Sequence, residues 1–225
     1  MATTEISKAA QSALVAAQQA RPMPTAKHWN SGQLAERNIS RAWVEKNPTY
    51  CDLERRYNPN NWAYVSREPD KAYTAECPAL GALADIYGKD EVAEAWIDTH
   101  LTAMFLSSGS KDSDMSSTIS AFAASFAQQV RGYKLTELML FFNNYKAGRY
   151  DDSYALFNPT RIGWCFFHKF LPERSAALQR IENERLNRIR DEHYANIASG
   201  KAMSLTEWQE YKRKHRQQQA EDSHE

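Results

Sequence analysis

The sequence predicts an all-α fold, with a compact multi-helix core and extended helical arms at its N- and C-terminal ends. Apolar residues recur at helical spacing along most of the chain. No stretch shows the alternation of period two that marks a half-buried strand. Capping residues and helix-stopping glycines and prolines separate the periodic stretches, so several helices are expected.

Residues 1–27 are expected to form a flexible N-terminal arm, because their helical spacing is loose and two prolines between residues 21 and 24 stop it. Residues 28–77 follow as an aromatic-rich region of short helices and turns. The best helix there is predicted over Gln33–Lys46. Its expected apolar face comprises Leu34, Ile39 and Trp43.

Aromatic and basic side chains are interleaved in residues 28–77. This composition resembles a protein-contact surface as much as a nucleic-acid one, because aromatic residues and arginine are enriched where proteins bind partners. The sequence therefore predicts a contact surface here. Its residues are Trp29, Trp43, Tyr50, Tyr57, Trp62 and Tyr64, with Arg37, Arg41, Arg55 and Arg56 among them.

Residues 78–172 are expected to form the helical core. Helical spacing predicts a helix in each of four segments: 80–87, 92–106, 119–130 and 135–145. Gly88 is expected to end the first of them, and Asp114 or Ser116 to cap the third. The fourth is so apolar that little polar face remains, so we expect it to be buried.

A polar hinge of ten residues, Arg149–Asn158, follows the fourth helix. Gly148 supplies the left-handed conformation that ends a helix, and Asn158 with Pro159 is a cap followed by a proline at the first helical position. The next helix is expected to bury residues at steps of four until Pro172 kinks or interrupts it. Those residues are Ile162, Phe166 and Phe170.

Residues 173–225 are expected to form polar helices and a tail. A long helix with sparse apolar residues is predicted up to about Ala198, with Gly200 as its stop. Its apolar residues do not hold a heptad, which argues against a strong coiled coil. Residues 204–207 read Ser-Leu-Thr-Glu, a capping box that predicts the start of a terminal helix.

The segment around the hinge has a recognisable pattern. Its residues are Tyr133, Glu137, Phe141, Phe142, Lys146, Gly148, Tyr150, Tyr154, Pro159, Ile162, Phe170, Glu173 and Arg174. The pattern resembles an uncharacterised small-protein family of bacteriophages and mobile elements of gut anaerobes, with a Lys-x-Gly-x-Tyr hinge between two apolar helices. Asp151 stands where that family usually has glycine, which argues against a glycine-dependent backbone contact with a ligand. The resemblance implies a setting in replication or host takeover.

The composition fits one core with polar extensions in a chain of 225 residues. The formal net charge is zero, which removes the general expectation of nonspecific nucleic-acid binding, although a local patch still acts within a Debye length. Three widely spaced cysteines fit reduced thiols in a cytoplasm. Neither a secretion signal nor a membrane span is expected.

The sequence contains no motif for a phosphate cradle, a zinc site, an EF-hand or a nucleophile elbow. Cys165 and His168 are the closest approach to a metal pair, because three residues place them on one helix face. No third ligand accompanies them, so a buried thiol beside a hydrogen-bonded histidine is favoured. We therefore expect no cofactor, no metal and no enzymatic activity.

Three carboxylates leave an enzymatic alternative open. Glu137 lies near the start of a largely apolar helix, where burial would suit a proton-transfer group. A structural role is favoured, in which Glu137 complements the helix dipole and pairs with Arg149 or Arg161. Asp151 and Asp152 would suit a divalent ion, but adjacent acids in a hinge more often form a solvated turn.

Two further surfaces are candidates for recognition. The hinge combines both charge signs with aromatic rings on a rigid scaffold; alternatively, its tyrosines pack on the core and brace the loop. We define the hinge surface as Lys146, Arg149, Tyr150, Asp151, Asp152, Tyr154 and Arg161. The candidate nucleic-acid contact is a terminal basic cluster, Lys212, Arg213, Lys214 and Arg216. Acidic residues in the same segment favour a solvated helix face over a binding patch there.

The sequence therefore favours a non-enzymatic binding or adaptor protein of a phage or mobile element, in the setting of DNA replication. The alternative is a structural component of a phage particle whose arms order on assembly. We expect a protein partner, with nucleic acid and a homo-oligomer as further candidates and no membrane contact. The expected location is the cytoplasm, or the phage particle within or outside the host.

Overall fold

All regular secondary structure that the structure describes is helical, which confirms the predicted all-α fold. The computed structural model describes residues 25–26, 39–89, 91–108, 115–150, 157–199 and 203–221, with side chains up to residue 213. The expected N-terminal arm lies outside these residues, apart from positions 25 and 26. The chain divides into two compact units, Met1–Arg174 and Ser175–Glu225.

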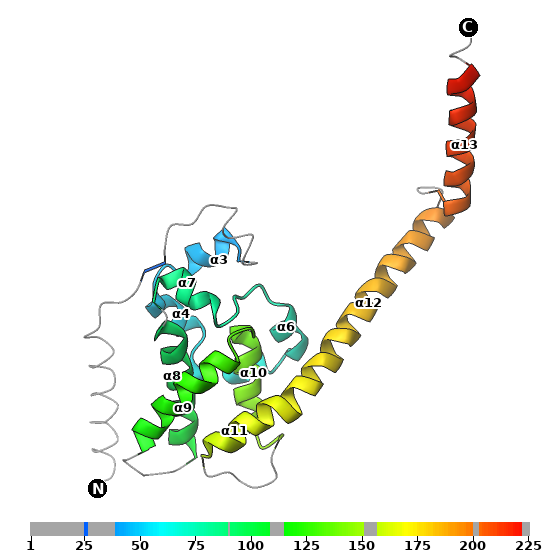
Figure 1. Cartoon of the computed structure of the whole chain (residues 1–225). Helices are drawn as coiled ribbons and strands as arrows, with labels where there is room; N and C mark the ends of the chain where they lie inside the picture. The colour runs from blue at the N-terminus through cyan, green and yellow to red at the C-terminus, as the bar shows by residue number, and fades with distance from the viewer. Residues whose placement is uncertain are drawn as a thin grey trace. The chain divides into compact units, whose positions relative to one another are not determined.

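The described part of the first unit has short helices up to residue 87 and mostly longer ones after it (Figure 1). The short elements are α3 (Arg41–Lys46), α4 (Tyr50–Arg56), the 3₁₀ turn η1 (Pro59–Asn61), α5 (Trp62–Val65), α6 (Pro69–Thr74) and α7 (Ala82–Tyr87). The later ones are α8 (Glu91–Ser107), α9 (Met115–Gln129), α10 (Leu135–Lys146), α11 (Pro159–Cys165) and the π-helix η2 (Phe166–Phe170). Two helices follow, α12 (Leu171–Ala198), which begins in the first unit, and α13 (Leu205–Glu221) in the second.

The predicted helix over Gln33–Lys46 is not continuous, because residues 39 and 40 are not helical and α3 begins at Arg41, while residues 33–38 lie outside the described part of the chain. The Ser40 side chain accepts a hydrogen bond of 3.0 Å from the backbone N–H of Trp43 and caps α3 at that point. Ile39 is buried but not helical. The serine cap therefore sets the start of the helix, although apolar spacing continues before it.

The predicted contact surface in residues 28–77 is wrong for most of its described aromatic residues, because they form part of the core. Those that are buried are Trp43, Tyr50, Tyr57 and Trp62. Trp43 Nε1 donates a 2.9 Å hydrogen bond to the Tyr57 hydroxyl, so these two rings also meet through their polar atoms inside the protein. Trp29 and Arg37 lie outside the described residues.

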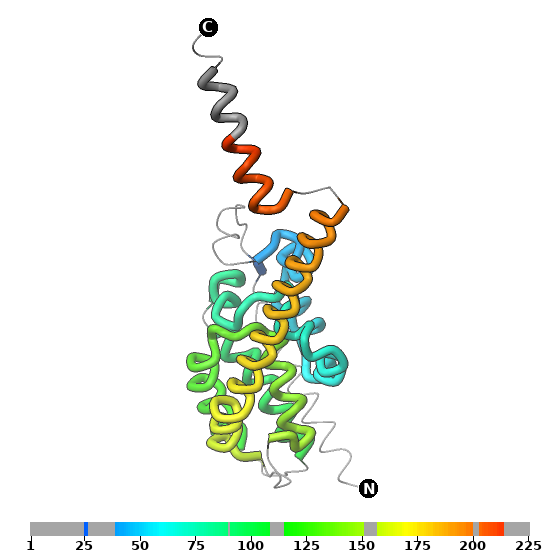
Figure 2. Tube along the Cα trace, turned by 90° about the vertical axis from the view of Figure 1, so that its right-hand side faces the viewer, coloured from blue at the N-terminus to red at the C-terminus, as the bar shows by residue number. Residues whose placement is uncertain are grey.

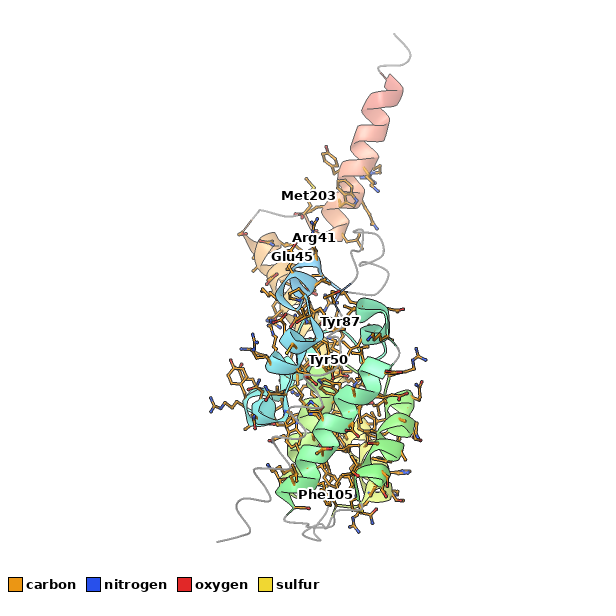
Figure 3. All side chains as sticks on the ribbon, turned by 90° about the vertical axis from the view of Figure 1, so that its left-hand side faces the viewer. Arg41, Glu45, Tyr50, Tyr87, Phe105 and Met203 are labelled. Atoms are coloured by element: carbon orange, nitrogen blue, oxygen red, sulfur yellow. The ribbon has the colours of Figure 1, made fainter. Side chains whose placement is uncertain are left out.

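Two ring contacts join this region to the longer helices. Trp62 stacks on Phe142 of α10, with ring centroids 5.8 Å apart. Tyr50 meets Tyr87 of α7 edge to face at 6.2 Å, and Figure 3 shows these two side chains close together. The buried core of the first unit therefore includes residues that precede the expected boundary at position 78.

The middle of the core is built on α8, α9 and α10. α8 and α9 pack side by side, and α10 packs against α5, α6 and α8 (Figure 1). Nine of the twelve residues of α10 are buried, which confirms the prediction that this helix lies inside. Gly88 has a φ of 71° and ends α7 as predicted. α9 begins at Met115, so Ser116 lies within the helix and is not its cap.

His100 of α8 is a fully buried polar residue in this core. Its Nδ1 accepts a 2.7 Å hydrogen bond from Trp62 Nε1, so the ring proton sits on Nε2, 2.9 Å from the carbonyl oxygen of Tyr57. The same carbonyl accepts a bond from Trp96 Nε1 at 3.0 Å. Burial lowers the pKa of His100 to about 3, against the opposing effect of the Tyr57 carbonyl.

The chain stays helical from Pro159 through Pro172, so of the two predicted outcomes, a kink or an interruption, the interruption does not occur (Figure 2). The π-helix η2 lies directly before the proline, and the N–H of Leu171 donates to the carbonyl of Phe166, five residues earlier. A proline in a regular α-helix would clash with the carbonyl four residues before it. The wider π turn accommodates this proline, so the chain stays helical.

The C-terminal helices follow their predicted bounds. α12 ends at Ala198 and has no buried residue. The capping box that precedes α13 is confirmed, because Ser204 N–H donates to Glu207 Oε2 at 2.6 Å and Glu207 N–H donates to Ser204 Oγ at 3.2 Å. Gly200, the predicted stop, lies outside the described residues.

Candidate functional site

The hinge surface begins at a regular helix end. Gly148 has a φ of 75°, as the left-handed position after α10 requires. The backbone N–H of Arg149 donates to the carbonyl of Asn144 at 3.0 Å. At the far end of the hinge, the Asn158 side chain accepts a bond of 3.1 Å from Arg161 N–H and caps α11 as predicted. Asp151, Asp152 and Tyr154 lie outside the described residues.

Tyr150 packs on the core. Its ring stacks on Phe141 at 5.9 Å and meets Phe170 edge to face at 6.5 Å. Its hydroxyl accepts a bond from Asn144 Nδ2 at 3.0 Å and donates one to Glu173 Oε2 at 3.1 Å. Burial, with the Glu173 carboxylate beside it, raises the pKa of Tyr150 well above its usual value. These contacts are those of a residue that braces the hinge.

Glu173, at the start of α12, contacts two adjacent residues of the hinge surface, Arg149 and Tyr150. Its Oε2 accepts from Tyr150, and its Oε1 lies 2.6 Å from Arg149 Nη2. The Glu173 carboxylate thus connects both Arg149 and Tyr150 to α12. Neither Glu173 nor Asn144 was among the predicted site residues, although the resemblance pointed to Glu173 as a matching position.

The remaining described members of the hinge surface point to other parts of the molecule. Lys146 Nζ lies 5.7 Å from the centre of the Trp62 ring, where a cation–π contact forms. Arg161 is exposed in the first turn of α11. The structure therefore brings Arg149 and Tyr150 together through Glu173, and it does not gather Lys146 into the same contact.

Glu137 has a different partner from the two that the sequence suggested. Its Oε1 accepts from Arg174 Nε at 3.1 Å and Nη2 at 3.0 Å, and its Oε2 accepts from the backbone N–H of Lys134. The pairing predicted with Arg149 or Arg161 is wrong. Arg149 follows the opposite end of α10, which spans about 18 Å of helix axis. Glu137 nevertheless has the structural position that the sequence favoured, in the first turn of a helix, where a carboxylate complements the helix dipole.

Cys165 and His168 do not lie on one helix face. The Cys165 thiol is buried and donates to the carbonyl of Tyr150 at 3.9 Å, whereas His168 is exposed and stacks on Trp164. The π-helix η2, which starts directly after Cys165 and contains His168, changes the rotation per residue, so three positions no longer return to the same side. Among the described residues, no three His, Cys, Asp or Glu side chains are placed to hold a metal ion.

The basic cluster lies in α13, beside two aromatic residues. Trp208 and Tyr211 stack at 5.5 Å with an interplanar angle of 11°, and Lys212 Nζ lies 5.0 Å from the centre of the Trp208 ring. Arg213 is exposed. Lys214 and Arg216 fall within the helix, but their side chains are outside the described part of the chain. Contact of this cluster with nucleic acid stays a prediction.

Comparisons with protein families, with curated proteins and with solved structures found no match to this chain. Across the described residues, none of the helices combines the length and the apolar character that crossing a bilayer requires.

Proposed function

We propose that this chain is a non-enzymatic binding or adaptor protein. The setting in a phage or mobile element, with a role as a DNA-replication accessory, follows from the resemblance of the hinge segment. The proposal has its main support in α12, a helix of 28 residues without a buried side chain. A helix of that kind contributes little to a core, and its exposed apolar residues are available to a partner.

α12 is stabilised by its own side chains. Arg180 pairs with Glu184 at 3.2 Å, four residues away, and Arg185 pairs with Glu182 at 2.8 Å, three residues away. Pairs at these spacings give exposed helices a small local stabilisation. The helix is therefore supported locally in a segment where burial contributes little, and its surface remains accessible.

Apolar side chains are nevertheless present on this polar helix. Leu186 is 51% exposed and Ile189 is 49% exposed, and their spacing of three places them on neighbouring positions of one face. Tyr194 is also exposed. Burying Leu and Ile against a partner contributes about 1.5–3 kcal/mol per fully buried side chain. We assign this face to a protein partner.

The test is affinity capture from extracts of the native host with the immobilised full-length protein. The double variant Leu186→Glu and Ile189→Glu is expected to lose a partner that the wild type retains, because two charges would have to be buried in the interface. A matched control replaces two exposed polar residues of the same helix, Asn187→Ala and Asn196→Ala, and should retain the partner.

Sizing the purified protein tests the alternative of a structural phage component. If the wild type forms large assemblies that the Leu186→Glu and Ile189→Glu variant disperses, the exposed face joins copies of this chain, and the particle alternative stands. If wild type and variant capture the same partners and have the same size, the proposed role of α12 is wrong.

A further inference from the structure

We propose that single-stranded nucleic acid binds an exposed patch on α11 and η2. We define this α11 patch by four residues, Arg161, Trp164, His168 and Lys169, all of which are exposed. The proposal deepens the binding function proposed above, on which it rests, by naming the chemical class of one partner. It differs from the hinge surface predicted from the sequence, with which it shares only Arg161.

The aromatic part of the patch is a stacked pair. Trp164 is 49% exposed, and the imidazole of His168 stacks on its indole with centroids 5.1 Å apart and an interplanar angle of 30°. By contrast, Trp62 and Trp96 of the same unit are buried in the core. An exposed stacked pair offers a flat π surface to an unpaired base, and one such stacking contact changes affinity roughly 5- to 150-fold.

The charge of the patch suits a polyanion. Lys169 Nζ lies 5.6 Å from the centre of the Trp164 ring, and Arg161 precedes Trp164 by one helical turn. No Asp or Glu occurs between Phe157 and Pro172. A chain with zero net charge thus carries a locally positive segment, where Lys and Arg neutralise phosphates and release counterions.

The combination favours a single strand over a duplex and over a protein. Paired bases stack on each other and do not offer their faces, so exposed rings add little to duplex binding. Protein interfaces are enriched in tryptophan and arginine but depleted of lysine, so it is Lys169 beside the indole that favours a strand over a protein. In the α11 patch, the exposed indole is flanked by cations, which is the arrangement of a strand-binding surface.

The same grouping recurs in the second unit. Trp208 stacks on Tyr211, and Lys212 lies over the indole. Glu207 of that helix is engaged in the capping box with Ser204, so it is held at the helix start. The recurrence of an exposed indole, a stacked ring and a lysine supports the chemistry assigned to the α11 patch.

The proposal is tested by fluorescence anisotropy with the full-length protein and labelled 20-mers of thymidylate and of uridylate, beside a duplex of mixed sequence. Binding of the single strands should exceed that of the duplex, and the two homopolymers distinguish DNA from RNA. Trp164→Ala should weaken strand binding roughly 5- to 150-fold, whereas Trp164→Phe, which keeps a ring, should retain most of it. Changing Lys169 to Ala should lower the salt slope by about 0.7.

Tyr64→Ala is the matched control. Tyr64 is 72% exposed and has Arg67 5.9 Å from its ring centre, but Glu68 and Asp70 follow it in the chain. This variant should bind the strands as the wild type does, and circular dichroism should show both alanine variants to be as helical as the wild type. Equal affinities of Trp164→Ala and Tyr64→Ala would overturn the proposal.

The outcome separates this inference from the proposed function. If the wild type binds neither strand but still captures a partner through Leu186 and Ile189, the inference is wrong and the proposed function stands. If strand binding depends on Trp164 while the α12 variant retains every partner, the nucleic-acid site stands and the assigned protein-binding face is wrong. Loss of a protein partner in Trp164→Ala, without strand binding, would make the patch a protein interface.

Discussion

Arg174 binds the buried carboxylate of Glu137 through two guanidinium nitrogens, Nε at 3.1 Å and Nη2 at 3.0 Å from the same oxygen. The Glu137 side chain is 1% exposed and that of Arg174 is 26% exposed. The guanidinium also lies over the ring of Tyr133, 5.1 Å from its centre. This contact joins the first turn of α10 to the first turn of α12, two elements that are 37 residues apart at this pair.

Replacing Arg174 with Met should destabilise the protein, because it leaves a buried carboxylate without its cation. Removing one partner of a buried pair costs about 3–5 kcal/mol, and the partial exposure of Arg174 places the expected loss at the lower end. Urea unfolding followed by circular dichroism measures it. Adding Glu137→Gln should recover much of the stability, and Arg188→Met on the exposed part of α12 serves as the control. A loss no larger than in that control would contradict the structural role of the pair.

Two single variants, Tyr150→Phe and Arg149→Ala, test which residue braces the hinge. Removing the Tyr150 hydroxyl breaks the bonds to Asn144 and Glu173 and should cost about 1 kcal/mol, the usual net value of a hydrogen bond. Arg149 forms an exposed pair, so its loss should cost less than about 1 kcal/mol. Urea unfolding of each variant, compared with the wild type, measures the two losses of stability. If Arg149→Ala is the more damaging change, Tyr150 is not the main brace.

His100 should make the protein less stable in acid. Its pKa is about 3 in the folded protein, below the ordinary value of 6.5, because burial disfavours the charged ring. Between these two values the unfolded chain binds more protons, so stability falls as pH decreases from 6.5 towards 3, by up to about 1.4 kcal/mol per pH unit. Above pH 6.5 this contribution is constant.

The comparison that isolates this effect is His100→Gln, unfolded in urea at constant ionic strength between pH 4 and pH 7. The variant has no imidazole to titrate, so its stability should fall less steeply with decreasing pH than that of the wild type. The test compares how stability changes with pH in the two proteins, so a difference in their stability at pH 7 does not affect the result. Parallel curves for the two proteins would mean that His100 does not govern the acid sensitivity.

The helix ends and caps around the candidate sites were largely predictable from the sequence, because they depend on contacts between residues that are close in the chain. Gly148 ends α10, Asn158 caps α11, and Ser204 with Glu207 caps α13, all as expected. Each of these features involves groups within a few residues of one another. The cap at Ser40 was not predicted, although its signal is also local.

The sequence by itself thus determined the helical class and the approximate bounds of the longer helices, whereas the tertiary structure decided the exposure of many aromatic side chains. Helical spacing and composition are the same for a tryptophan that fills a core and for one that is exposed. Trp62 is buried against α10, and Trp164 is exposed, although both were surrounded by aromatic residues in the sequence. The partner of Glu137 was likewise beyond local reasoning, because Arg174 reaches it only when two distant helix starts pack together.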